Sequence, residues 1–170
     1  MDKIVGAQIW ATETGLGRLA KLLYDSGVLD KVQIKTKGDG REVSLGWYRS
    51  EDVIDDDSAF IGAIDTLLIL EAPLPDPFNW NIVHVAKTMG KRVVLMPMYE
   101  CTPSGGLHLV DEIICPSLLD LEYYKQENAS FITVPADDTV MWKERKTAHT
   151  FIHNAGHGGV AGRNGTEELI

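Results

Sequence analysis

The chain has 170 residues, of which 44% are hydrophobic and 24% charged. These proportions are typical of one sizeable folded domain and exclude a disordered or low-complexity protein. With 16 basic and 25 acidic residues the formal charge is −9, and no basic stripe with interleaved aromatic residues occurs, so nucleic acid is not expected as a partner.

Hydrophobic runs and cysteines limit the cellular setting that we expect. No apolar run approaches the roughly 20 residues of a membrane span. The first predicted strand begins at once, without the layout of a signal peptide. Two cysteines cannot form a disulfide scaffold. We therefore expect a reduced, cytoplasmic protein.

The first half of the chain alternates short β-rich runs with helical patterns, as in a parallel sheet with crossover helices. A strand is predicted over residues 3–10. Residues 15–27 predict a helix, because apolar residues recur at i, i+3, i+4 and i+7 and Gly27 provides a stop. The alternating run 31–36 predicts a half-buried strand near an edge of the sheet.

The second half continues the same alternation. The apolar run within 65–71 is followed by prolines and predicts a central strand covered on both faces. Asn79 is predicted to cap a helix that Gly90 closes, and Ser117 to begin a capping box. We therefore expect an α/β fold, a Rossmann-like open parallel sheet with helices on both faces. Further strands are predicted over 91–99, 111–115, 130–134 and 147–155.

Gly15 and Gly17 follow the first predicted strand and open the first predicted helix. Glycines let a backbone approach a ligand, and helix N-terminal amides favour anions. The pattern G-x-G-x-x-A ends at Ala20, and Asp39 follows about 20 residues later, which also fits a dinucleotide-binding fingerprint. Four residues separate the strand from Gly15, more than a tight dinucleotide turn has. A ligand loop and a plain turn both stay open.

The segment 156–165 is rich in glycine and leads into a short helical pattern at 166–170. It is not a phosphate-binding P-loop, because G-x-x-x-x-G-K-[ST] cannot be placed on it. Arg163 adds a cation that can pair with phosphate oxygens, and Thr166 adds a hydroxyl. A flexible linker would explain the glycines but not the helix opening that follows Arg163.

Glu100 follows a predicted central strand, and ligands of open α/β sheets bind beyond the carboxyl ends of strands. Its carboxylate is a candidate base or a candidate holder of a sugar hydroxyl; the alternative is a loop carboxylate in water. His149, His153 and His157 recur every four residues, but on a predicted strand and a glycine-rich loop rather than on a helix. No metal site is expected from them.

Several motifs occur together in one order along the chain. The motifs are TGLG at 14–17, KRVVLMPMYE at 91–100, DEIICPS at 111–117, VPAD at 134–137, HNAG at 153–156 and RNGTEEL at 163–169. Their succession resembles the GT-B glycosyltransferases of the glycogen-synthase-like, retaining group, and the resemblance covers nearly all of the chain.

The resemblance implies two Rossmann-like domains that face a cleft, the first holding the acceptor and the second the nucleotide-sugar donor. Residues 1–148 would form the acceptor-side domain. Residues 149–170 would supply the first strand, glycine-rich loop and helix start of a donor-binding domain that is otherwise missing. A sugar transferase is expected, inactive as this fragment, with a nucleotide-sugar as donor and no other cofactor.

The resemblance also implies a set of donor contacts. Gly15 and Gly17 would lie near the donor diphosphate, and the segment 163–165 would stand where the family has a basic residue that touches it. Asn164 replaces a lysine that the family often has there. The candidate donor-binding residues are Gly15, Gly17, Arg163, Asn164, Gly165 and Thr166, and the candidate catalytic residue is Glu100.

Two other interpretations stay open. One is an NAD(P)-binding oxidoreductase domain that uses the glycines of the first loop together with Asp39. The other is a non-catalytic Rossmann-like binding module, for which a homodimer is a possible form. A glycosyltransferase predicts a nucleotide-sugar and a sugar or glycan acceptor as partners.

Overall fold

A computed structural model describes residues 3–10, 15–35, 45–74, 76, 78–98, 101–125 and 128–133. All of them belong to one compact unit, Met1–Ala136. The predicted strand over 147–155 and the glycine-rich segment 156–165 lie outside the described residues.

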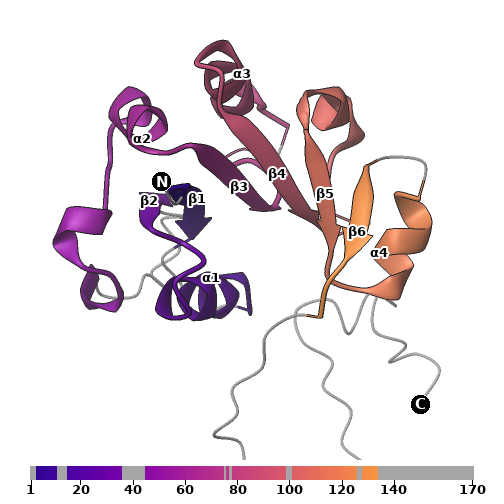
Figure 1. Ribbon diagram of the computed structural model, residues 1–170, viewed down its shortest axis with the longest axis horizontal. Coiled ribbons are helices and arrows are strands. Elements are labelled where there is room, and N and C mark those ends of the chain that lie inside the picture. Colours follow the sequence, from indigo (N-terminus) through magenta and orange to yellow (C-terminus); the bar gives the residue numbers. More distant parts are fainter. Residues whose placement is uncertain are drawn as a thin grey trace, which may run out of the picture. The chain divides into compact units, whose positions relative to one another are not determined.

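The described residues form a six-stranded sheet in the order β2-β1-β3-β4-β5-β6 (Figure 1). Every pair of neighbouring strands in it is parallel. The predicted parallel α/β fold is therefore confirmed, with β2 at an edge and β3 in the interior, as the sequence patterns indicated. The strands are β1 (Val5–Trp10), β2 (Lys31–Lys35), β3 (Thr66–Glu71), β4 (Arg92–Pro97), β5 (Glu112–Cys115) and β6 (Ala129–Phe131).

Four α-helices accompany these strands in the described part of the chain, together with short 3-10 helices. None of the helices described is both long and apolar enough to cross a membrane. The α-helices are α1 (Gly15–Asp25), α2 (Asp57–Ala63), α3 (Asn81–Thr88) and α4 (Leu118–Tyr123), and the 3-10 helices are η1 (Leu45–Trp47), η2 (Ser50–Asp52) and η3 (Ser104–Leu109).

The helix ends follow local side-chain chemistry. Gly27, two residues beyond α1, has a φ of 76°, the left-handed conformation that ends many helices. Ser117 begins α4 as predicted, since its Oγ accepts a hydrogen bond from the amide of Asp120 at 3.1 Å. The predicted cap of α3 was wrong by one residue. Trp80 occupies the N-cap position, and Asn79 accepts instead from the amide of Asn81, in a short turn before the helix.

Helices cover both faces of the sheet, as predicted. Connections between parallel strands are right-handed, and the chain runs from β1 outward to β2 but from β3 in the opposite direction to β4, β5 and β6. This reversal places α1 on one face and α2 and α3 on the other (Figure 1). Alternate residues of β3 and β4 supply the two cores: Leu68, Leu70, Val94 and Met96 pack with α1, and Leu67, Ile69, Val93 and Leu95 pack with α2 and α3.

A buried amide pair joins the two outermost strands on one side of the sheet. Gln8 of β1 donates from Nε2 to Oε1 of its register partner Gln33 at 2.8 Å. Gln33 in turn donates to the carbonyl of Asp55 at 2.7 Å and to Oδ1 of Asp57 at 2.6 Å. The edge strand β2 is thereby tied both to β1 and to the start of α2.

Candidate functional site

The neighbouring strands β1 and β3 are parallel, but the strand that follows β1 is added on one side of the sheet and the strands that follow β3 are added on the other side. In open α/β sheets, ligands bind beyond the carboxyl ends of strands at such a switch point. A cavity of about 10 Å³ lies there, room for roughly one water molecule. It is mostly apolar and is lined by Gln8, Ile9, Trp10, Leu16, Leu70 and Leu74.

Helix α1 begins at this edge of the sheet with the predicted glycines. Gly15 is its first residue and is exposed, whereas Gly17 is buried. A Cβ placed on Gly15 would meet no atom of the described residues within 4 Å, apart from its chain neighbours and the backbone of its own helix, so packing against the described part of the chain does not require glycine there. The first turn carries no acidic residue and includes the exposed Arg18. Its amides and the Arg18 guanidinium therefore make this helix start favourable for an anion.

The other predicted site residues lie outside the described part of the chain, so their roles remain predictions. Within the described residues, no three His, Cys, Asp or Glu side chains gather as ligands for a metal ion. The residues outside the described part are Glu100, Arg163, Asn164, Gly165 and Thr166, together with Asp39 of the dinucleotide-binding alternative.

A strained turn at the end of β3 was not predicted. Glu71 has a φ of 67° and is the one non-glycine residue with a positive φ among those described. The amide of Ala72 donates to the carbonyl of Leu70 at 2.9 Å, which closes a three-residue turn around Glu71. A γ-turn with a positive central φ is rare. For a residue with a side chain this conformation costs about 1–3 kcal/mol.

A neighbouring loop holds the turn in place. The hydroxyl of Thr102 donates to the carbonyl of Glu71 at 2.6 Å and accepts from the amide of Met98 at 3.1 Å. On the other side of the turn, Ala72 and Pro73 are buried. Pro73 restricts Ala72 to extended conformations, so Glu71 is the residue that adopts the turn conformation. In the sequence, only the Ala72-Pro73 pair that follows Glu71 indicates this turn.

Trp80 lies near this edge, where α3 begins, and its indole N–H is a hydrogen-bond donor without an acceptor in the described part of the chain. The Nε1 atom of this donor is buried. The indole packs so closely on Gly106 of η3 that a Cβ there would lie 1.9 Å from its Cδ2. A buried donor without an acceptor costs about 1–3 kcal/mol.

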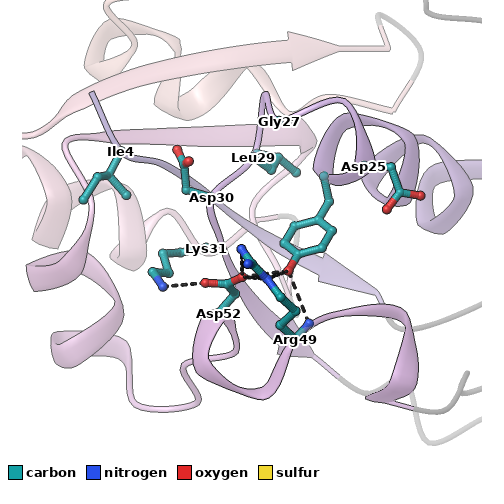
Figure 2. Close-up of a pocket in the computed structure, with 9 residues that line it drawn as sticks. Ile4, Asp25, Gly27, Leu29, Asp30, Lys31, Arg49 and Asp52 are labelled. Atoms are coloured by element: carbon teal, nitrogen blue, oxygen red, sulfur yellow. Dashed lines mark hydrogen bonds and ion pairs between the residues drawn. The ribbon is translucent and has the colours of Figure 1, made fainter. Parts of the chain in front are cut away.

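A larger cavity, of about 470 Å³, opens at the opposite edge, where β1 and β2 begin (Figure 2). It lies among the end of α1, the residues that precede β2, and η2. Ligands of open α/β sheets bind at the carboxyl edge, so this cavity lies at the wrong end for the predicted site.

Three of the five charged residues that line this amino-edge cavity, Lys31, Arg49 and Asp52, bind one another, while Asp25 pairs with Lys21 and Asp30 accepts from the amide of Val5. The buried Asp52 accepts hydrogen bonds from Nζ of Lys31 at 2.6 Å, from the Tyr24 hydroxyl at 2.7 Å and from Nε of Arg49 at 2.8 Å (Figure 2). The bond from Lys31, with smaller contributions from Tyr24 and Arg49, lowers the pKa of Asp52 to about 2 against the opposing effect of burial. This network ties η2 to α1 and β2, and we interpret it as a structural clamp.

Comparisons with known proteins add little to this geometry. No protein-family model and no curated protein matches the sequence. Among solved structures, the homoserine dehydrogenase of S. aureus at pH 7.0 is 13% identical, with a TM-score of 0.40. The match covers 77% of this chain and 33% of that chain. A likeness at this TM-score carries no argument, and the fold rests on the strand order itself.

Proposed function

We propose that this chain is the acceptor-side domain of a glycosyltransferase that uses a nucleotide-sugar donor, with its ligands at the carboxyl edge of β1 and β3. The observation that carries the proposal is the start of α1 at the switch point, where Gly15 leaves open space for a ligand. The ordered motifs that resemble retaining GT-B enzymes supply the sugar-transfer chemistry.

In the proposed chemistry, several hydrogen-bond donors together stabilise the leaving group, and no single side chain supplies most of the effect. Departure of a nucleoside diphosphate leaves negative charge on its phosphate oxygens, and donors already aimed at that charge stabilise it. The amides that open α1 and the guanidinium of Arg18 are such donors on this chain. Arg163 and Thr166 are the proposed further contacts. The acceptor sugar would lie beyond the ends of β3 and β4.

Binding to the chain itself tests the proposal. We would titrate ¹⁵N-labelled chain with UDP-glucose, GDP-mannose and NAD⁺ and follow the backbone amide shifts. A nucleotide-sugar is expected to shift the amides at the start of α1. Shifts there with NAD⁺ and with neither nucleotide-sugar would instead support the dinucleotide-binding alternative, and no shift with any of the three would contradict the proposal.

A matched pair of variants separates ligand contact from folding. Gly15 and Gly62 are exposed helix residues, and a Cβ on either would meet no atom within 4 Å in the described part of the chain, apart from its chain neighbours and its own helix backbone. Gly15→Leu is expected to weaken nucleotide-sugar binding about tenfold, which corresponds to roughly 1.4 kcal/mol, because the side chain fills the ligand's space. Gly62→Leu in α2 should leave the affinity unchanged. Equal affinities for the two variants would remove the start of α1 from the site.

A further inference from the structure

The strained turn at Glu71 is held by hydrogen bonds that involve no atom of the Glu71 side chain. Glycine would adopt a φ of 67° without strain. The hydrogen bond from Thr102 to the Glu71 carbonyl and the bond from Ala72 to Leu70 would both form with glycine, since they involve backbone atoms of the turn. A glutamate at a position suited to glycine points to a role for the carboxylate itself.

The carboxylate of Glu71 also differs from its counterparts. Three other carboxylates in the described residues are not exposed, and each receives a hydrogen bond: Asp52 from Lys31, Glu112 from Arg92, and Asp120 from Ser117. Residue Glu71 is half-buried, and for its carboxylate the described residues provide no donor and no cation. A ligand that donates hydrogen bonds would supply the partners that the described residues do not provide.

The position of Glu71 suits such a ligand. It ends the interior strand β3, beside the switch point and at the same edge as the start of α1. The Thr102 bridge from the loop after β4 fixes its backbone before any ligand arrives. A group held in advance loses little conformational freedom on binding.

We infer that the Glu71 carboxylate accepts hydrogen bonds from neighbouring hydroxyls of a sugar bound at this edge. The inference rests on the proposed function and names the sugar-binding group within it. Two carboxylate oxygens can accept from two adjacent hydroxyls at once. Such a pair of hydroxyls occurs both on the ribose of a nucleotide and on a hexose, and different probes separate the two sources.

The test compares the wild type with Glu71→Gln, which keeps the shape, and Glu71→Gly, which removes the carboxylate and the strain. The exposed Glu51 at the opposite edge supplies the control Glu51→Gln. Affinities for UDP-glucose, UDP and methyl α-D-glucoside are measured by NMR titration, and the thermal midpoint of each variant is recorded. Both Glu71 variants should bind UDP-glucose about tenfold more weakly, equivalent to roughly 1.4 kcal/mol, while the control binds normally.

The thermal midpoints and the probes decide among the outcomes. Glu71→Gly should have a higher midpoint than the wild type, so its weaker binding cannot come from unfolding. A matching loss with UDP assigns the ribose, and a loss with methyl α-D-glucoside but not with UDP assigns the hexose. UDP-glucose binding by the wild type that Glu71→Gln leaves within about twofold overturns the inference and spares the proposed function. No binding of any probe to the wild type overturns both.

Discussion

Each of the two edges of the sheet carries an acidic residue that is not fully exposed, and the two residues, Asp52 and Glu71, differ in what surrounds their carboxylates. At the amino edge, Asp52 lies beside a cavity of about 470 Å³ and receives hydrogen bonds from Lys31, Tyr24 and Arg49. At the carboxyl edge, Glu71 lies in a strained turn, and its carboxylate has no donor among the described residues. In the larger cavity, the buried carboxylate already has hydrogen-bond partners from the chain itself. A carboxylate without a partner, rather than the volume of a cavity, is the reason why we propose the carboxyl edge as the ligand-binding edge.

The largest effect should come from opening the amino-edge clamp. Asp52→Asn is expected to lower the free energy of unfolding by about 3 kcal/mol, because it leaves the Lys31 ammonium without its buried counter-charge. Urea denaturation at neutral pH measures the change. Glu51→Gln is the control and should change stability by less than about 0.5 kcal/mol, since the Glu51–Arg49 pair is exposed at both ends. A small effect of Asp52→Asn would refute the clamp.

The same clamp should weaken in acid. The pKa of Asp52 is lowered from 3.8 to about 2 on folding, so its contribution is complete above pH 4 and is lost as the pH falls toward 2. The stability difference between the wild type and Asp52→Asn should therefore shrink by about 2 kcal/mol over this range. Only the difference between the two proteins is informative, because the pKa values of Asp57 and Asp111 are lowered as well. A difference that is constant with pH would contradict the assignment.

At the carboxyl edge, loss of the Thr102 hydroxyl should have a moderate effect. Thr102→Val removes the bond to the Glu71 carbonyl and leaves the Met98 amide without this acceptor, at a cost of about 1–2 kcal/mol in unfolding free energy. Thr88→Val is the matched control, because the Thr88 hydroxyl makes a single exposed bond within α3. Sugar binding should weaken for Thr102→Val alone. Equal losses of stability for the two variants would show that the turn needs no bridge.

The smallest effect has the opposite sign. Glu71→Gly should raise the free energy of unfolding by about 1 kcal/mol, since relief of strain exceeds the entropy that glycine adds to the unfolded chain. Glu71→Ala keeps the strain and should show no such gain. Chemical denaturation of both variants checks the comparison, and a loss of stability for glycine would mean that the side chain contributes to packing.

Much of the fold was predictable from local pattern. Strand periodicity, apolar runs and the glycine after α1 placed most of the described elements, because each depends on neighbouring residues. Helix α2 was not among the predicted helices, because its seven residues are too few for a clear period. The N-cap of α3 was displaced by one residue, because both Asn79 and Trp80 precede the helix and only the backbone conformation distinguishes them.

The candidate site was less predictable. Gly15 and Gly17 were expected at the start of α1 from their place after a strand, and the structure has them there. The positive φ of Glu71 leaves no mark on an apolar pattern, and it depends on Thr102, 31 residues away. The Tyr24–Asp52 contact spans 28 residues and likewise has no local signal. Glu100 and the residues from 163 to 166 remain predictions.

The buried glutamine pair has a consequence for assembly of the sheet. If β2 slipped by one residue along β1, Gln33 would leave Gln8 and the carbonyl of Asp55, and an amide would enter apolar surroundings without a partner. If only apolar side chains were buried between β2 and its neighbours, several registers of β2 along β1 would differ less in free energy. The two glutamines thus favour one register of the outermost strand over its neighbours, and this selection acts while the sheet assembles, before any ligand binds.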